Sequence, residues 1–233
     1  MLELRGIHTF YGAAHILHDV SLEVRPGEVV ALLGRNGAGK TTTMKSVMGL
    51  AEARRGEILY EGRPIRGLAA FAIARLGIGY VPEERRIFKQ LTVMENLEVG
   101  RREPLEGARV WELDELFTLF PNLAERRENL GGHLSGGEQQ MLTIARTLMG
   151  APKTVLLDEP SEGVAPVIVE QMAHTIEALK AQGLAVLLSE QNVRFAERVS
   201  DRACIIESGR IQFDGAMAEL AARPEVREQY LAL

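Results

Sequence analysis

Residues 34–42 read Gly-Arg-Asn-Gly-Ala-Gly-Lys-Thr-Thr, which fits the pattern of Gly, four residues, Gly, Lys and then Ser or Thr. The three glycines, Gly34, Gly37 and Gly39, are expected to take positive φ angles and to let backbone N–H groups approach an anion without a Cβ in the way. The apolar residues 29–33 predict a buried strand before the loop, and residues 43–48 predict the start of a helix after it. A Gly-rich turn that matched by chance would not have a buried strand before it and a helix after it. We therefore predict a loop that binds the phosphates of a nucleotide.

The last residues of this loop have specific expected roles. Lys40 can place its ammonium group between the β- and γ-phosphates, and the Thr41 hydroxyl can bind Mg²⁺. Thr42 and the helix that follows direct a helix N-terminus at the same negative charge. We therefore expect the whole loop to contact the nucleotide, through Gly34, Arg35, Asn36, Gly37, Ala38, Gly39, Lys40, Thr41 and Thr42.

Size and charge limit the classes of protein that fit. The chain has 233 residues and a formal net charge of −5, which predicts one domain or two closely packed ones and no sequence-wide basic footprint for nucleic acid. The single cysteine, Cys204, has apolar neighbours that predict a buried structural thiol, which is consistent with a reducing compartment. No apolar run approaches the ~20 residues of a membrane-crossing helix, and no charged-then-apolar leader is seen. We expect another component to provide any membrane attachment.

The first part of the chain predicts antiparallel strands. Residues 2–4 and 20–24 alternate apolar and polar side chains, as strands with one buried face do. Between them, residues 9–12 read Thr-Phe-Tyr-Gly and predict a loop. An exposed aromatic in such a loop can stack on a base, because every base offers a π face. It can equally pack under a turn, and the residues alone leave both interpretations open.

The middle of the chain predicts an insertion into a sheet-containing core. Strands are predicted at residues 56–60 and 78–82, a short helix at 69–75, and a charged, solvated loop at 83–88. Residues 92–130 predict helices, beginning with a capping box at Thr92. We therefore expect residues 62–130 to form a mostly helical insertion between two parts of one core, residues 1–61 and 131–233.

Residues 134–140 read Leu-Ser-Gly-Gly-Glu-Gln-Gln. Ser135 is expected to cap a helix that runs to about residue 148. Two glycines at a helix start can also present backbone N–H groups to an anion. An N-cap with no further role and an anion site are both compatible with these residues.

Two adjacent acids follow the apolar run at residues 154–157. A buried parallel strand delivers such residues to its carboxyl edge, where open α/β sheets bind ligands. Asp158 is expected to hold Mg²⁺ through water, and Glu159 to polarise the attacking water. The rest of the chain predicts helices at 167–180, 194–199 and 225–231, a buried strand at 184–189, and a hairpin of 203–206 with 209–215.

The loop, the L-S-G-G-E-Q-Q segment and the L-L-D-E-P strand together resemble an ATP-binding cassette (ABC) ATPase over nearly the whole chain. The resemblance implies an α/β fold in a single domain, residues 1–233: a P-loop NTPase with a RecA-like mixed sheet core, an N-terminal antiparallel β subdomain and an inserted α-helical subdomain that touches the membrane partner. It implies that Tyr11 stacks on adenine and that Glu159 is the catalytic glutamate. The segment expected to contact the ATP of a second subunit is Ser135, Gly136, Gly137 and Glu138.

Two positions depart from the superfamily's common pattern. Glu83 stands where glutamine usually faces Mg²⁺ and water, and an ionised carboxylate can still ligate the metal. Gln191 stands where a histidine usually faces the γ-phosphate, and its amide can donate a hydrogen bond but carries no titrating proton. We keep Gln191 as a residue of the catalytic site and expect Thr41, Glu83 and Asp158 at the metal.

Both departures point to one branch of the superfamily. V-P-E-x-R-R-I-F, L-F-P-x-L-x-E-R, L-D-E-P-S-x-G-x-A-P and S-E-Q-N look like the smaller ATPase of branched-chain amino-acid importers, the LivF type, although Glu162 stands where this branch usually has an uncharged residue. The resemblance implies ATP and Mg²⁺ as ligands, with branched-chain amino acids, or a related amino acid, amide or urea, as cargo. It implies a second ATPase subunit of the same or a related kind, two permease subunits, an indirectly acting solute-binding protein, and a peripheral position on the cytoplasmic face of the membrane.

Two other classes of protein fit these residues less well. A soluble ABC ATPase acting on nucleic acid or ribosomes usually carries a long coiled-coil insertion or two cassettes, and neither is present in this negatively charged chain. We therefore expect no nucleic-acid partner. A GTPase would need an N-K-x-D motif, which is absent, and a small-molecule kinase would not account for the L-S-G-G-E-Q-Q segment.

Overall fold

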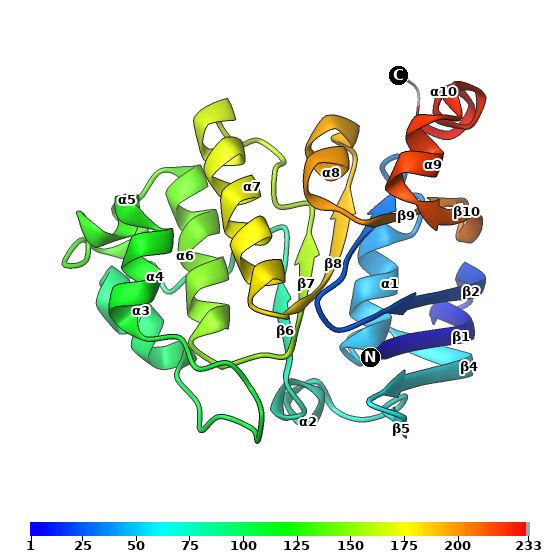
Figure 1. Cartoon of the computed structure of the whole chain (residues 1–233). Helices are drawn as coiled ribbons and strands as arrows, with labels where there is room; N and C mark the ends of the chain where they lie inside the picture. The colour runs from blue at the N-terminus through cyan, green and yellow to red at the C-terminus, as the bar shows by residue number, and fades with distance from the viewer. Residues whose placement is uncertain (232–233) are drawn as a thin grey trace.

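The computed structural model describes residues 1–231 and contains two sheets with helices packed between and around them (Figure 1). The smaller sheet is antiparallel, in the order β2 (Ala14–Val24), β1 (Leu2–Tyr11), β4 (Glu52–Tyr60) and β5 (Arg63–Pro64). The larger sheet has the order β10 (Arg210–Ala216), β9 (Arg202–Glu207), β3 (Val29–Leu33), β8 (Ala185–Glu190), β7 (Thr154–Asp158) and β6 (Ile78–Val81). It is mixed, because β10 is antiparallel to β9 while the other neighbours are parallel.

The centre of the larger sheet is apolar on both faces. Every residue of β3, β7 and β8 is buried, as expected for parallel strands covered by helices on both sides. Helix α1 (Lys40–Val47) packs between the two sheets, and its Met44 and Val47 join a core with apolar residues of both. On the opposite face, helices α6 (Gly136–Leu148) and α7 (Pro166–Ala181) contribute to a second core. The strand ends are therefore held rigidly at one edge.

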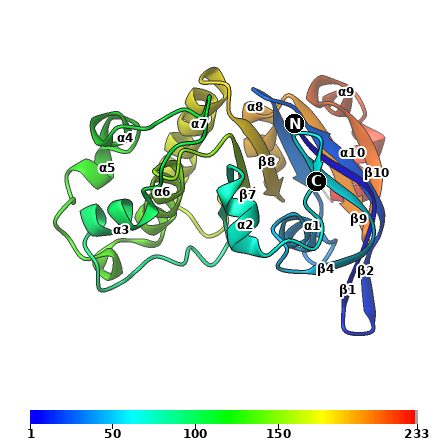
Figure 2. The same ribbon diagram turned by 90° about the horizontal axis from the view of Figure 1, so that it is seen from below.

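A group of short helices lies on the side of α6 that faces away from the smaller sheet, as Figures 1 and 2 both show. They are α3 (Val93–Gly100), α4 (Leu113–Leu119) and α5 (Pro121–Ala124). Residues 101–112 are irregular rather than helical. The expected insertion at 62–130 also contains β6 and α2 (Ala70–Arg75), and β6 is an edge strand of the larger sheet. The helices of this group begin with α3 at Val93, next to the predicted capping residue Thr92.

Local capping signals in the sequence are confirmed. Thr92 and Ser135 each accept a hydrogen bond from the backbone of the residue three positions on, and each forms a full capping box with Glu95 and Glu138, respectively. One expectation was wrong: residues 9–11 are not in a loop but continue β1, which pairs with β2 up to Tyr11 and Ala14. The remaining elements are η1 (Gly131–His133), α8 (Val193–Val199), α9 (Met217–Ala221) and α10 (Pro224–Leu231).

Several further predictions from the sequence can be compared with the structure. The hairpin of β9 and β10 is present, and Cys204 is fully buried in β9, where burial raises the pKa of its thiol. The helix α9 was not predicted. A bilayer-spanning helix is absent from the described part of the chain, since none of its helices is both long and apolar enough. The predicted single domain, 1–233, includes residues 232 and 233, which lie outside the described residues.

Candidate functional site

The loop at residues 34–42 connects the buried strand β3 to helix α1, as predicted. Gly37 and Gly39 have φ angles of +78° and +117°, a region that favours glycine. The expectation of a positive φ at Gly34 is wrong; a Cβ there would lie 2.4 Å from the Ile206 carbonyl oxygen, so a close approach to β9 requires this glycine. The loop, α1 and Glu159 line a pocket of about 100 Å³.

Lys40 points its ammonium group into the loop. Its Nζ donates to the carbonyl oxygens of Gly34, at 2.7 Å, and Arg35, at 2.9 Å. It also lies 3.1 Å from Oε1 of Glu159, with 2% of the Lys40 side chain and 6% of the Glu159 side chain exposed. The ammonium therefore has a buried carboxylate and two carbonyl groups around it.

Asp158, at the end of β7, is fully buried and accepts three side-chain hydrogen bonds. The donors are Thr41 Oγ1 at 3.0 Å, Ser189 Oγ at 2.7 Å and Tyr80 OH at 2.9 Å. Burial, followed by the charge of Asp158, raises the pKa of Tyr80, so the phenol stays protonated and donates. Because β6 and β8 both pair with β7, they bring Tyr80 and Ser189 to the carboxylate from either side.

Sequence reasoning missed Tyr80 and Ser189 as contributors to this site. The available signal was that Asp158, Ser189 and Val81 all lie at or next to the carboxyl ends of predicted parallel strands, which meet at one edge of a sheet. Strand order was not predicted, and it decides which strand ends are neighbours. Tyr80 therefore looked like an ordinary strand residue.

The oxygen atoms at this edge suit Mg²⁺. Thr41 supplies a hydroxyl and Asp158 a carboxylate, and Mg²⁺ typically binds one or two carboxylates and keeps several waters. Glu83, in the loop after β6, is exposed. Burial, and then the charges of Glu159 and Asp158, raise the pKa of Glu83, so the three carboxylates are close enough to repel one another. A divalent cation would relieve that repulsion.

Glu159 has a constrained backbone and a carboxylate with several partners. Its φ angle is +46°, an uncommon value for a residue other than glycine, and its N–H donates to the carbonyl oxygen and the hydroxyl of Ser189 at 3.1 and 3.0 Å. Burial alone would raise the pKa of Glu159. Hydrogen bonds from Glu162 and Gln191 together with the ion pair to Lys40 outweigh burial, so the pKa of Glu159 is lowered.

Glu162 forms a carboxyl pair with Glu159. Its hydrogen bond to Glu159, then burial and the charges of Glu159, Glu83 and Glu190, raise the pKa of Glu162. The pKa values of the pair therefore shift in opposite directions, upward at Glu162 and downward at Glu159. The residue that departs from the branch pattern thus lies directly beside the expected catalytic group.

Gln191 connects the strand end to the loop. Its Nε2 donates to Glu159 Oε2 at 2.6 Å and to Asn36 Oδ1 at 2.7 Å. The preceding residue, Glu190, is buried and accepts backbone N–H bonds from Ser161, Gln191 and Asn192, at 3.1, 3.2 and 3.1 Å. Burial raises the pKa of Glu190, although these hydrogen bonds act in the opposite direction. Glu190 therefore holds the two strand-end loops together.

Other expected site residues lie elsewhere. Ser135, Gly136, Gly137 and Glu138 begin helix α6, which lies on the face of the larger sheet opposite to α1 (Figure 1). Ser135 caps α6, and Glu138 forms an ion pair of 2.8 Å with Arg126. Tyr11 ends β1 with 46% of its surface exposed. Within residues 1–231, the structure gives no hydrogen bond from this tyrosine to the loop at 34–42.

Comparison with known proteins identifies the family. The family model described as "ABC transporter" matches residues 17–162. The chain is 46% identical, over 99% of itself and 99% of the relative, to the high-affinity branched-chain amino acid transport ATP-binding protein BraG of Pseudomonas aeruginosa. The chain belongs to the ABC transporter family. Within it, the chain is an ATP-binding subunit that resembles those of branched-chain amino-acid transporters, and its reaction is the hydrolysis of ATP.

Further relatives and solved structures agree on the fold. The lipopolysaccharide export ATP-binding protein LptB of Haemophilus influenzae is 41% identical over 99% of this chain and 97% of its own length. An ATP-binding subunit of an ABC transporter superposes with a TM-score of 0.82 at 30% identity, covering 100% of this chain and 96% of the other. A nucleotide-free cassette superposes with a TM-score of 0.83 at 26% identity, covering 98% and 97%. The predicted ABC ATPase fold is confirmed.

Proposed function

We propose that this chain is the ATP-hydrolysing subunit of an importer that takes up branched-chain amino acids or a related amino acid, amide or urea. The observation that carries this proposal is the 46% identity to BraG over nearly all of both chains. The sequence patterns around Glu83, Glu159 and Gln191, which look like the LivF type, support it. The LptB relatives favour a second candidate, an exporter, because their identity also extends over nearly the whole chain.

The nucleotide site has the groups that phosphoryl transfer needs. Lys40 and the N–H groups at the start of α1 face the pocket and suit the β- and γ-phosphates. Thr41, Asp158 and Glu83 would hold Mg²⁺, which neutralises charge on the phosphates when bound. The oxygen donors and the Gly37 and Gly39 backbone fit these ligands.

Glu159 is the residue proposed to accept the proton of the attacking water. Its lowered pKa keeps it ionised near pH 7, which is the state a general base requires. Gln191 orients this carboxylate through the 2.6 Å hydrogen bond and carries no titrating proton itself. We therefore assign proton transfer to Glu159, and the orientation of the Glu159 carboxylate to Gln191.

The position of Ser135–Glu138 supports a two-subunit site. In the same chain these residues lie on the face of the larger sheet opposite to α1, the helix that follows the phosphate loop. We propose that they complete the ATP site of a second subunit, the same chain or a related one, as the N–H groups at the start of α6 suit an anion. Tyr11, exposed at the end of β1, is proposed to stack on adenine.

The proposed assembly also includes two permease subunits and, indirectly, a solute-binding protein. The chain would act at the cytoplasmic face of the membrane as a peripheral subunit, and no nucleic-acid partner is proposed. This assembly follows from the importer assignment. It requires ATP hydrolysis to depend on association, because one chain supplies only half of each site.

Transport assays test the proposal. A host that lacks its own branched-chain ATPase subunit is complemented with this chain and candidate permease subunits, and uptake of labelled leucine, isoleucine and valine is measured. We expect ATP-dependent uptake with the wild-type chain and background uptake with Glu159→Gln. Co-purification with a lipopolysaccharide-export permease, with no amino-acid uptake, would overturn the importer assignment in favour of the exporter.

A further inference from the structure

Three histidines gather on the smaller sheet, outside the ATP site. His8 lies on β1, and His15 and His18 lie on β2, all of them partly exposed. Nδ1 of His8 is 3.1 Å from Nε2 of His15, and the rings of His15 and His18 have centroids 3.8 Å apart. None of these imidazoles has a part in the proposed ATPase chemistry.

The spacing of the two facing nitrogens matches that of two ligands on one metal ion. Imidazole nitrogens bind Zn²⁺ at about 2.0–2.1 Å, so two of them on one ion lie about 2.9 Å apart at a 90° angle and about 3.35 Å apart at the tetrahedral angle. The observed 3.1 Å lies between these values. Without an ion, the two nitrogens at this distance form a hydrogen bond. For both lone pairs to face an ion, the ring that donates must move its proton to its other nitrogen.

The surroundings hold the His15 ring in place. Phe10, directly opposite His15 on β1, stacks on it with centroids 4.1 Å apart and planes 8° from parallel. The guanidinium of Arg54 lies over Phe10, 4.8 Å from its centroid. A ligand ring fixed by packing loses little freedom on metal binding.

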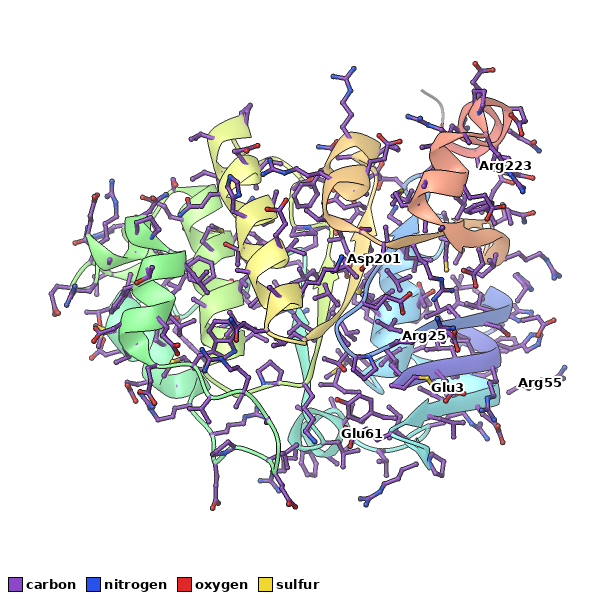
Figure 3. The ribbon with its side chains drawn as sticks, viewed as in Figure 1. Glu3, Arg25, Arg55, Glu61, Asp201 and Arg223 are labelled. Carbon is purple, nitrogen blue, oxygen red and sulfur yellow. The ribbon has the colours of Figure 1, made fainter. Side chains whose placement is uncertain are left out.

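One cationic side chain lies near the pair. Arg55 pairs with His8 in the register of β1 and β4, and Figure 3 shows its side chain pointing away from the sheet into solvent. A neutral imidazole is the form that ligates metals.

We propose that His8 Nδ1 and His15 Nε2 form a binding site for a divalent transition-metal ion of the Zn²⁺ class. Imidazole suits Zn²⁺, Cu²⁺ and Ni²⁺, whereas Mg²⁺ prefers oxygen. The described residues contain no group of three or more His, Cys, Asp or Glu arranged to hold a metal, so we assign only these two imidazoles as protein ligands. The bound ion joins β1 to β2 on either side of the hairpin turn that follows Tyr11.

Calorimetric titration of the full chain with ZnCl₂, at pH 7.5 and without nucleotide, tests this site. We expect one Zn²⁺ per chain, with an affinity that falls at least about tenfold in His8→Gln and in His15→Gln, since even residues outside a ligand set change metal affinity 10–100-fold. His133→Gln, an exposed histidine in η1, is the matched control and should bind as the wild type does.

A second measurement uses the wild-type chain alone. Nitrogen-15 spectra of the histidine side chains should show Zn²⁺-dependent shifts at His8 Nδ1 and His15 Nε2, with the opposite nitrogen of each ring protonated. The proposal is overturned if wild-type protein binds no Zn²⁺. It is also overturned if all three variants bind equally, or if the shifts fall on other histidines such as His174.

Discussion

Gln191 donates one hydrogen bond of 2.6 Å to Glu159 and another of 2.7 Å to Asn36 in the phosphate loop. One side-chain NH₂ group makes both contacts, so the amide ties the expected general base to the loop that faces the nucleotide. Gln191→Ala removes a hydrogen bond to a charged group, which is typically about 1.5–3 kcal/mol. This energy corresponds to a factor of roughly 10 to 100, and we expect kcat at saturating ATP to fall by that factor.

Replacement by histidine provides the comparison for this variant. An imidazole at this position would retain a ring N–H donor, so Gln191→His should keep most of the activity that Gln191→Ala loses. Both variants are compared by steady-state phosphate release under the same conditions. Equal kcat in wild type and Gln191→Ala would refute a role in orienting Glu159.

Glu159→Gln should stop turnover and spare nucleotide binding. Glutamine has the same shape and still bonds to its neighbours, but it cannot accept a proton from water. General-base loss typically costs about 10²- to 10⁴-fold, so we expect kcat to fall by that factor while the Kd for ATP stays within a few-fold. Single-turnover hydrolysis and equilibrium ATP binding measure the two quantities. Glu106→Gln, in an exposed loop, is the control and should leave both unchanged.

The ion pair between Lys40 and Glu159 should appear as coupling in stability measurements. Both side chains are buried, so Lys40→Met leaves a buried carboxylate without its cation. We expect the free energy of unfolding to drop by about 1–3 kcal/mol, and the double variant with Glu159→Gln to be more stable than the sum of single effects predicts. Urea unfolding of the four proteins gives the coupling energy. Strict additivity would show that the pair contributes no net interaction.

Tyr80 should influence the magnesium requirement of the ATPase. Its hydroxyl donates to Asp158 Oδ2 at 2.9 Å and so orients a carboxylate expected at the metal. Loss of such a supporting bond typically weakens metal affinity about 10- to 100-fold, so Tyr80→Phe should raise the Mg²⁺ concentration for half-maximal activity by roughly tenfold or more.

Tyr60→Phe is the matched control for Tyr80→Phe. Tyr60 OH lies 3.2 Å from Thr154 Oγ1, at the opposite end of β7 from Asp158. This variant should lose about 1 kcal/mol of stability and keep the wild-type Mg²⁺ dependence. A Mg²⁺ titration that shifts equally in both variants would argue against a role specific to Tyr80.

Glu162→Gln should change the pH dependence of stability. The folded-state pKa of Glu162 is raised, chiefly by its hydrogen bond to Glu159, so the folded chain holds this proton more tightly than the unfolded chain does. Wild-type protein therefore loses stability as the pH rises from the ordinary glutamate range through the raised pKa. Glutamine can still donate to Glu159 and does not titrate.

The difference in melting temperature measures this effect. We expect the Tm of Glu162→Gln relative to wild type to increase between about pH 4 and pH 7, because only the wild type has a proton to lose there. Scanning calorimetry of both proteins at several pH values gives the two melting temperatures. A difference that is constant or decreases with pH would mean that folding does not raise the pKa of Glu162.

Features that depend on neighbouring residues in the chain were predicted well. The strand, loop and helix around residues 29–48, the caps at Thr92 and Ser135, and the buried strands β7 and β8 all follow from short-range patterns. The helices expected within residues 92–130 are also present, although residues 101–112 between them are irregular.

Contacts between segments far apart in the chain were not predicted. Asp158 meets Thr41, which is 117 positions away, and Tyr80, which is 78 positions away. A contact within one turn was also missed: the sequence marked Glu162 only as an unusual residue and did not predict its pairing with Glu159, three positions earlier, where φ is +46°. Periodicity assigns strands, but it contains no information on their order in the sheet.

The sequence by itself determined the chemistry that is available: a phosphate loop with Lys40 and Thr41, two acids at a strand end, and a Ser-Gly-Gly helix start. Tertiary structure alone decided which of these groups meet. The order β8-β7-β6 brings Ser189 and Tyr80 to Asp158, while the same packing leaves Ser135 on a separate helix. The physical reason is that side-chain periodicity is set within a few residues. The order of parallel strands instead depends on how distant helices pack to cover both faces of the sheet.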